Sequence, residues 1–495
     1  MTAIADRSDI QSLEPKLVWR YFSGIASIPR PSKHEEKIRA HVKRLAESLS
    51  FAVREDHVGN LLIEVPATKR YENKPPTVLQ GHLDMVCEKN AGITHNFDTD
   101  PIRLVRSTVK GKDIIHADGT TLGADNGIGV ALALAVATDP DAVHGPLEIL
   151  CTIDEETGMT GAKNIAPDFF KGRRMINLDS EEDDAIYIGC AGGTDTTFQW
   201  SLPLSAPPSV AEGWRISVSG LKGGHSGCDI HLNRGSAIAL LAQALSTLNA
   251  PTLQLAAISG GSKRNAIPRE ASATVVGSSD VLSRLRNVAS AIQSEAIANG
   301  ESNCTVMVDA VSASLAASPQ DSWRVLAALA ALPHGVLAVV PDIPGLVQTS
   351  NGTTIATSAV KGGDLHIEIG CLSRSSSKSD LAATLRKLAA VGSLAGARTE
   401  HGNEYPGWAP NSKSPTLAAC RRTYERVFGH APRIASIHAG LECGIIGERV
   451  GGMDMVSFGP NIHGAHSPDE CVEVASVNMM YRYLLGVLKD LASGV

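Results

Sequence analysis

At 495 residues the chain is too long for one ordinary hydrophobic core, so we expect two domains. The net charge of −7 argues against nucleic acid or an anionic membrane as a partner. No stretch approaches the roughly 20 uninterrupted apolar residues that a membrane-spanning helix needs. The N-terminal residues are polar where a signal peptide needs an apolar centre. Nine cysteines without close pairs are typical of a reducing compartment, and we expect a cytoplasmic location.

The first part of the chain alternates between helical and strand-like patterns, which is typical of an α/β sheet covered on both faces. An amphipathic helix is expected over residues 35–49. A glycine-rich loop leads into residues 130–139, which are apolar almost all round and therefore predict a buried central helix. Apolar strands are expected at 59–65, 77–83, 147–153 and 175–178.

Near residue 189 the pattern changes to period-two alternation mixed with long Ala- and Leu-rich helices, which is α+β in character. Residues 402–415 are rich in Pro, Gly and Asn and indicate a boundary. Helical and strand-like segments then resume and close with an amphipathic helix over 474–491. We therefore predict an α/β domain with a mostly parallel central sheet, formed by residues 1–191 and 406–495. An inserted α+β domain over 192–405, large enough for two smaller halves, interrupts it.

Three adjacent carboxylates, Asp154, Glu155 and Glu156, follow the apolar run that ends at Ile153. Neighbouring acids raise one another's pKa unless a cation lies between them. A loop facing water would relieve the repulsion, and so would a metal ion, which keeps nearby carboxylates ionised. In the second case one carboxylate could bind metal while its neighbour serves as general base.

Other polar residues stand at the ends of apolar runs. His82 and Asp84 project from one face of their strand, an arrangement that orients imidazoles in metal sites, although an ordinary hydrogen-bonded histidine also fits. Asp125 precedes the central helix and is either an N-cap or a bridging carboxylate. Asp179 follows another apolar run, and His466 begins a turn where a surface histidine is the alternative. Histidine nitrogens and carboxylate oxygens at such strand ends would suit two zinc ions.

Ordered blocks along nearly the whole chain resemble the aminoacyl-histidine dipeptidases, also called Xaa-His or carnosinase-like dipeptidases. These belong to the superfamily of di-zinc aminoacylases and carboxypeptidases. The blocks are QGHLDMVCEKN, DGTTLGADNGIG, IDEETGMTGA, NLDSE, GLKGGHSG, GGSKRNAIPRE, IHAGLECG and HSPDE.

The resemblance implies a site with two divalent metal ions, zinc first and cobalt or manganese as alternatives. Its ligands would be His82 and Asp179 for one ion, Glu156 and His466 for the other, and Asp125 for both. Asp84 would orient His82, and Glu155 would be the general base for a water that bridges the ions. The resemblance also implies a cis peptide bond between Asp125 and Asn126.

The inserted domain resembles the lid of this family. By that resemblance His225 would donate to the scissile carbonyl oxygen, although a turn histidine is the simpler interpretation. Asn265 and Arg374 would hold the substrate, the guanidinium suiting a free C-terminal carboxylate. Arg374 could equally be a solvated loop charge. Gly440 would expose backbone to the substrate, and a homodimer is expected.

The leading hypothesis is metal-dependent hydrolysis of dipeptides, of the Xaa-His type such as β-alanyl-histidine or over a broad range. The alternative enzyme is an aminoacylase or amidohydrolase that acts on N-acyl amino acids. An inactive relative that only binds or scaffolds would have lost ligands or base, and all are present. A serine hydrolase is disfavoured because the sequence around Ser226 lacks the Gly-x-Ser-x-Gly pattern.

Overall fold

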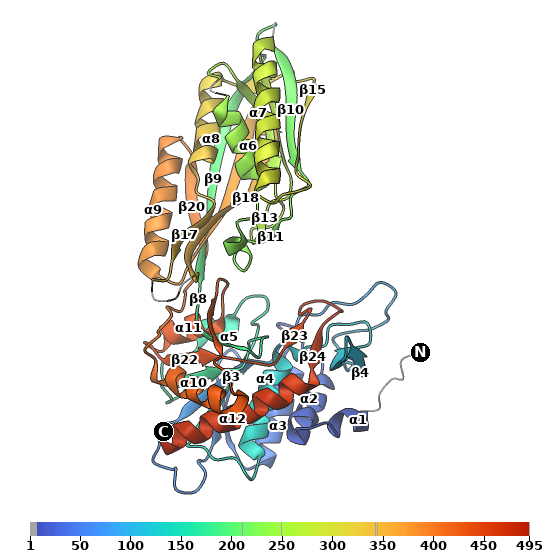
Figure 1. Ribbon diagram of the computed structural model, residues 1–495, viewed down its shortest axis with the longest axis vertical. Helices are drawn as coiled ribbons and strands as arrows, with labels where there is room; N and C mark the ends of the chain where they lie inside the picture. The colour runs from blue at the N-terminus through green and yellow to red at the C-terminus, as the bar shows by residue number, and fades with distance from the viewer. Residues whose placement is uncertain (1–6, 210, 249, 342, 344, 495) are drawn as a thin grey trace. The chain divides into compact units, whose positions relative to one another are not determined.

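The computed structural model describes residues 7–494 except 210, 249, 342 and 344, and these residues form two compact units (Figure 1). Unit 1 comprises Met1–Gly189, Pro410–Ser436 and Leu441–Val495. Unit 2 comprises Cys190–Ala409 and Ile437–Gly440. The sequence analysis places the changes of domain after residues 191 and 405, and it does not anticipate the return of 437–440 to unit 2.

Unit 1 is built on an eight-stranded sheet in the order β1-β2-β6-β3-β7-β22-β8-β21. Its centre is parallel and consists of β6 (Leu147–Thr152), β3 (Thr77–His82), β7 (Arg174–Asn177) and β22 (Asp454–Ser457). The outer strands are β1 (Ala52–Glu55), β2 (Leu61–Val65), β8 (Ala185–Cys190) and β21 (Arg433–Ile437). Strands β3 and β6 are buried at every residue, as expected for parallel strands covered on both faces.

Helices cover this sheet, and α4 (Ala124–Thr138) is the most buried of them. It contacts β3, so the all-apolar segment predicted as a central helix does lie against the sheet. The other helices of unit 1 are α1 (Arg7–Gln11), α2 (Lys16–Ala26), α3 (Glu36–Ser48), α5 (Thr160–Asn164), α10 (Pro415–Phe428), α11 (Glu442–Arg449) and α12 (Val474–Ser493). The predicted helices at 35–49 and 474–491 correspond to α3 and α12.

A second, four-stranded sheet in unit 1 has the order β23-β24-β5-β4. Its strands are β4 (Leu104–Val109), β5 (Lys112–Ala117), β23 (Ile462–His463) and β24 (Cys471–Glu473). Strands β4 and β5 were not predicted from the sequence. Their charged outer positions dilute the apolar signal, because only one part of this hairpin is buried.

Unit 2 is built on a ten-stranded antiparallel sheet, whose main path is β15-β10-β14-β12-β18-β19-β9-β16, with β17 beside β18 and β20 beside β9. These strands are β9 (Gly192–Ser205), β10 (Glu212–Ser219), β12 (Gln254–Gly260), β14 (Ala271–Gly277), β15 (Thr305–Val311), β16 (Ala316–Ala317), β17 (Gly335–Val339), β18 (Val347–Lys361), β19 (Asp364–Ser375) and β20 (Arg398–Tyr405). The helices are α6 (Ala237–Thr247), α7 (Ser279–Ala298), α8 (Pro319–Ala331) and α9 (Lys378–Leu394), with a 3-10 turn at Ile230–Leu232. A two-stranded ribbon pairs β11 (Gly224–His225) with β13 (Ala266–Ile267).

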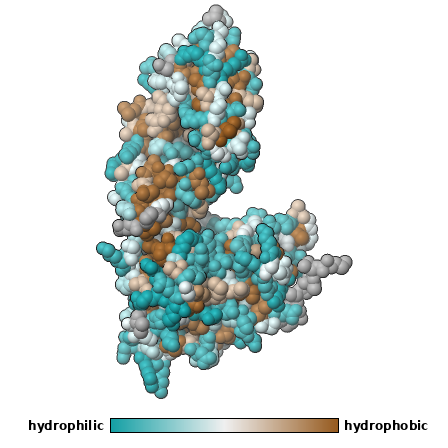
Figure 2. All heavy atoms as spheres, viewed as in Figure 1, coloured by the Kyte–Doolittle hydropathy of each residue, from teal (hydrophilic) through white to brown (hydrophobic). Residues whose placement is uncertain are grey.

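The α/β class with an interrupting α+β unit is thus confirmed. On the face of unit 1 seen in Figure 2, hydrophilic residues predominate and hydrophobic ones occur in small groups. Among the described residues, no helix has both the length and the apolar character required to cross a membrane.

Candidate metal centre

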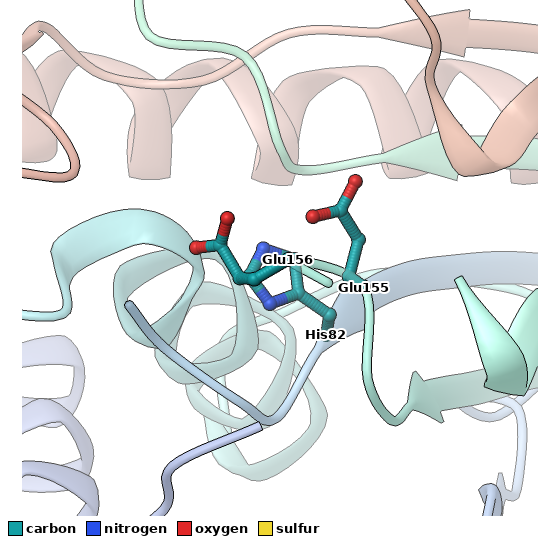
Figure 3. Close-up of side chains that lie close together, drawn as sticks. All are labelled: His82, Glu155 and Glu156. Atoms are coloured by element: carbon teal, nitrogen blue, oxygen red, sulfur yellow. The ribbon is translucent and has the colours of Figure 1, made fainter. Parts of the chain in front are cut away.

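Four chain segments bring their polar residues to one edge of the central sheet of unit 1. His82 is the last residue of β3, Glu155 and Glu156 follow β6, and Asp179 follows β7. Parallel strands that lie side by side end at the same edge, which is where α/β sheets place their sites. Asp125 joins them from the first turn of α4. Figure 3 shows His82, Glu155 and Glu156 grouped at this edge.

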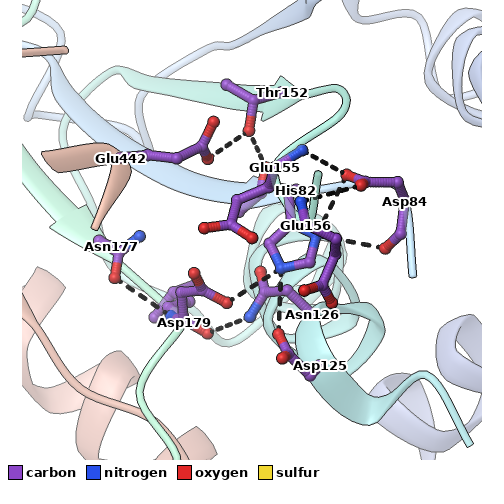
Figure 4. Close-up of polar contacts among 12 residues, drawn as sticks. His82, Asp84, Asp125, Asn126, Thr152, Glu155, Glu156, Asn177, Asp179 and Glu442 are labelled. Carbon is purple, nitrogen blue, oxygen red and sulfur yellow. Dashed lines mark hydrogen bonds and ion pairs between the residues drawn. The ribbon is translucent and has the colours of Figure 1, made fainter. Parts of the chain in front are cut away.

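Asp125 lies between two imidazoles. Its Oδ1 is 3.0 Å from Nε2 of His82, and its Oδ2 is 3.1 Å from Nε2 of His466. A second carboxylate lies near the same nitrogen of each imidazole. Asp179 Oδ1 is 3.3 Å from His82 Nε2, and Glu156 Oε2 is 3.0 Å from His466 Nε2. One carboxylate is therefore shared by two sets of donors. Figure 4 shows its contact with His82.

The ligand atoms within each set lie within 4.8 Å of one another. The two sets that share Asp125 are His82, Asp125 and Asp179, and Asp125, Glu156 and His466. A third set consists of His82, Glu155 and Glu156. All five ligands expected from the sequence are thus brought together, together with the expected general base.

Asp84 holds both His82 and the acidic loop. Its Oδ1 lies 3.4 Å from His82 Nδ1 and accepts the backbone N–H of Glu155 at 3.0 Å. Its Oδ2 accepts the N–H of Glu156 at 3.2 Å and the Ser32 hydroxyl at 2.8 Å. Burial would raise the pKa of Asp84, but the hydrogen bond and charge of His82 lower it to about 2. The expected orienting carboxylate therefore also fixes the backbone of the two glutamates.

The cluster carries more acid than its own cations can balance. Burial raises the pKa of Glu155 well above its usual value and that of Asp179 to about 7. Hydrogen bonds that Asp125 and Glu156 accept from His466 raise the pKa of this histidine to about 11. Raised pKa values of the carboxyl groups and of the imidazole both mean that the site tends to hold protons, because it lacks positive charge. Divalent cations would supply that charge.

Two buried carboxylate oxygens in this cluster have no hydrogen-bond partner among the described residues. They are Oε1 of Glu156 and Oδ1 of Asp179. Buried polar atoms are nearly always paired, so two such oxygens within a cluster of imidazoles and carboxylates fit a bound cation. The donors are imidazole nitrogens and carboxylate oxygens, which zinc accepts. The residues present therefore fit a pair of divalent ions.

Two buried charged residues that the sequence analysis missed hold the backbone around this cluster. The Glu470 carboxylate accepts the N–H groups of four successive residues, Leu122 to Asp125, at 2.7–3.2 Å. The Arg30 guanidinium donates to the carbonyl oxygens of Leu83 and Asp84 at 2.9 and 2.7 Å and to that of Gly123. Glu470 is the last residue of the HSPDE block that begins with His466, so this block could have pointed to it. Arg30 lies in none of the blocks that resemble the family.

The first acid of the triplet has a different role from the other two. Asp154 is buried, has a φ of 51°, and accepts the hydroxyls of Thr157 and Thr160. It shapes the turn that presents Glu155 and Glu156. The peptide bond between Asp125 and Asn126 is cis, as the resemblance implies.

His225 of unit 2 has a defined tautomer. Its Nδ1 accepts the backbone N–H groups of Gly227 and Cys228 at 3.2 and 2.9 Å. A neutral imidazole whose Nδ1 is an acceptor carries its proton on Nε2. Burial and the nearby charge of Arg374 lower the pKa of His225, which favours this neutral form. His225 therefore presents an N–H donor, as the expected role requires.

Arg374 lies near the end of β19 and is buried, so the interpretation as a solvated loop charge is wrong. Its Nη1 donates to the Tyr405 hydroxyl at 2.7 Å, and its Nε is buried without a hydrogen-bond partner among the described residues. A Cβ on Gly227 would lie 3.0 Å from that Nε and 3.1 Å from Cε1 of His225. His225 and Arg374 thus both lie close to Gly227. The Nε edge of the Arg374 guanidinium remains available to an anion.

The other two residues expected to bind substrate, Asn265 and Gly440, are more exposed than Arg374. Asn265 is exposed next to β13, and its carbonyl oxygen accepts the N–H of Ser226. This bond joins it to the residue after His225. Gly440 is partly exposed and ends the short segment 437–440 of unit 2. In the same segment the Nε2 of His438 lies 2.7 Å from the Ser350 hydroxyl.

Two donor sets around a shared carboxylate, at the edge of a parallel sheet, define a candidate dinuclear metallohydrolase. Residues 78–490 match the model of peptidase family M20/M25/M40. The chain is 43% identical over 492 residues to the cytosol non-specific dipeptidase of Escherichia coli K12, covering 98% of this chain and 99% of that protein. The chain belongs to peptidase family M20/M25/M40, and the resemblance found in the sequence is confirmed.

Solved structures agree with this assignment. The crystal structure of aminoacylhistidine dipeptidase from Vibrio alginolyticus matches with a TM-score of 0.89 and 39% identity over 97% of both chains. Aminopeptidase PepT from Bacillus cereus matches with a TM-score of 0.59 and 15% identity over 97% of this chain and 99% of its own. The second likeness concerns the fold alone.

Proposed function

We propose that this protein is a metal-dependent dipeptidase with two divalent ions, zinc in the first place. The observation that carries the proposal is the carboxylate of Asp125, whose two oxygens face two different imidazoles. The likeness to a dipeptidase over nearly the whole chain supports the substrate class. His82 and Asp179 would hold one ion, Glu156 and His466 the other, and Asp125 both. When bound, such ions lower the pKa of water and polarise a carbonyl group.

Glu155 is the proposed general base. Its backbone N–H is fixed by Asp84, and its carboxyl group lies beside His82 and Glu156. It takes the proton of the attacking water and returns it to the nitrogen of the leaving amine. Burial raises the pKa of Glu155, which suits a group that must hold a proton between these two steps. Asp84 holds His82 and the loop of Glu155 and Glu156 in fixed positions during the reaction.

Unit 2 supplies the proposed substrate contacts. The buried Arg374 binds the free C-terminal carboxylate of a dipeptide, with Tyr405 holding the guanidinium in place. His225 donates from Nε2 to the oxygen on which negative charge develops. Asn265 and Gly440 are proposed to contribute backbone and amide contacts to the substrate.

The proposed substrate range is broad and includes Xaa-His dipeptides such as β-alanyl-histidine. One relative is described as non-specific and another as an aminoacylhistidine dipeptidase, and both descriptions support this range. A cytoplasmic location and a homodimer complete the proposal. The first rests on the cytosolic relative, and the second on the family resemblance.

The decisive experiment combines metal analysis with a substrate panel. Purified protein should contain two divalent ions per chain, lose activity on dialysis against a chelator, and regain it with zinc, cobalt or manganese. β-Alanyl-histidine, several α-dipeptides, their C-terminal amides and N-acetyl amino acids are then assayed side by side. Full activity in protein that elemental analysis shows to be free of metal would refute the metal-dependent reaction. Preference for N-acetyl amino acids would instead favour an aminoacylase.

A further inference from the structure

A row of buried polar side chains crosses the parallel centre of the unit 1 sheet just below the candidate metal centre. Its members follow the order of the strands, with Thr152 on β6, Gln80 on β3, Asn177 on β7 and Ser457 on β22. All four are at most 1% exposed. The strands around them are otherwise Leu-, Ile- and Val-rich, so this row departs from the apolar pattern that parallel strands need.

The hydrogen bonds of the row run in one direction and end on Glu442, the first residue of α11. Ser457 donates to Oδ1 of Asn177, and Asn177 donates to Oε1 of Gln80 at 2.6 Å. Gln80 then donates to Oε2 of Glu442 at 2.6 Å. The Thr152 hydroxyl donates to the same oxygen at 2.6 Å, a contact drawn in Figure 4. Glu442 is fully buried and is the common acceptor of β3 and β6.

Three of the four donors stand two residues before a residue of the metal centre or of its acidic turn. Gln80 precedes His82, Thr152 precedes Asp154, and Asn177 precedes Asp179. Gln80 and His82 both lie on β3 and share a face of the sheet, because side chains two residues apart on a strand do so, and Thr152 and Asn177 are the last residues of β6 and β7. Oδ1 of Asn177 also accepts the N–H of Asp179 at 3.3 Å.

We propose that Glu442 and this row are positioning residues of the metal centre. Hydrogen bonds across β6, β3 and β7 fix how far each strand extends along the sheet relative to its neighbours. They thereby fix the separation of the two donor sets at the strand ends. Among the described residues, Glu442 forms no ion pair with a cationic side chain. Burying such a carboxyl group is costly, whereas apolar residues in these positions would carry no such cost. The inference rests on the proposed function, because it concerns the spacing of the metal ligands.

A matched pair of variants tests this role. Thr152 and Thr423 are both fully buried in unit 1, and each hydroxyl donates to a carboxylate, that of Glu442 and that of Asp490 respectively. Thr152→Val and Thr423→Val therefore remove equivalent groups inside and outside the row. We expect Thr152→Val to bind Zn²⁺ and Co²⁺ about 10- to 100-fold more weakly in a chelator competition, as for other groups that orient metal ligands. Thr423→Val should match wild type in metal affinity while showing a similar loss of thermal stability.

Glu442 is tested with a conservative and a disruptive variant. Glu442→Gln keeps an oxygen acceptor for Gln80 and Thr152 and should stay close to wild type in metal affinity. Glu442→Leu should lose about 10- to 100-fold and alter the visible absorption of the Co²⁺ protein. At saturating metal it should lower kcat and leave the KM for dipeptides unchanged.

Equal metal affinities for Thr152→Val, Thr423→Val and wild type would overturn the positioning role, and this pair decides even if Glu442→Leu does not fold. That result would leave the proposed function standing if wild type binds two ions. Wild type that binds no metal would remove the proposed function instead.

Discussion

The two units gather opposite kinds of polar groups. In unit 1, carboxylates crowd around two imidazoles. Burial raises the pKa of Glu155, and hydrogen bonds accepted by Asp125 and Glu156 raise that of His466. In unit 2, Arg374 is buried with an unpaired Nε, and burial together with its charge lowers the pKa of His225. The first arrangement suits cations, and the second suits the anionic parts of a substrate. Variants of unit 1 should therefore change metal binding or proton transfer, and those of unit 2 should change the handling of substrate.

The largest expected effect is that of Glu155→Gln. The amide keeps the shape of the side chain and its backbone bond to Asp84 but accepts no proton. We expect kcat to fall about 10²- to 10⁴-fold, with two ions still bound per chain by elemental analysis. Asp125→Asn is the comparison, because it should lose metal. A loss of metal in Glu155→Gln as large as that in Asp125→Asn would contradict the role as base.

His225→Ala should follow, with kcat about 10²- to 10³-fold lower and metal content unchanged. The reason is the loss of the Nε2–H donor that Gly227 and Cys228 fix by binding Nδ1. His231→Ala serves as control, because His231 is an exposed histidine of the same unit. Similar kcat values for the two variants would remove the oxyanion role and leave the turn interpretation.

Arg374→Ala should raise the KM for dipeptides about 10- to 100-fold, the size expected for losing hydrogen bonds to a charged group. Wild type assayed on C-terminally amidated dipeptides should show a comparable rise, since the substrate then lacks the carboxylate. Amidation of the substrate should change the KM of the Arg374→Ala variant little. If wild type handles amidated and free dipeptides alike, Arg374 does not bind the C-terminus.

Tyr405→Phe gives the smallest effect and sharpens the assignment of Arg374. The hydroxyl accepts from Nη1 of the charged Arg374 guanidinium, and a hydrogen bond to a charged group contributes about 1.5–3 kcal/mol, of which only a part bears on substrate binding because Tyr405 acts through Arg374. We expect KM to rise by about threefold to tenfold with kcat little changed. The effect should vanish in the Arg374→Ala background, and additive effects in this double-mutant cycle would show that Tyr405 acts independently.

The strand ends of the candidate site were accessible from the sequence because each apolar run stops where a polar residue begins. The predicted strands 77–83 and 147–153 end within one residue of β3 and β6, which places His82 and the acidic triplet at one edge. The buried central helix was accessible for the same reason. Local pattern alone left His82, Asp125 and His466 open to simpler interpretations, and only the resemblance of ordered blocks gave them ligand roles.

The buried charges around the site could not be predicted. Glu470 accepts from the N–H groups of Leu122 to Asp125, and Glu442 accepts from Gln80 and Thr152, across hundreds of residues of chain. No periodicity links such partners, because their pairing exists only after the sheet has formed. For Asp154 the sequence suggested too much. Because it is adjacent to Glu155 and Glu156, it looked equivalent to them, whereas in the structure it stabilises the turn.

The carboxylate of Glu470 links two parts of the molecule that are far apart in sequence. It accepts the N–H groups that open α4, and it stands four positions after His466. A single substitution at Glu470 should therefore disturb the backbone of Asp125 and the loop of His466 together, so that the proposed ligands of both ions would respond to one change.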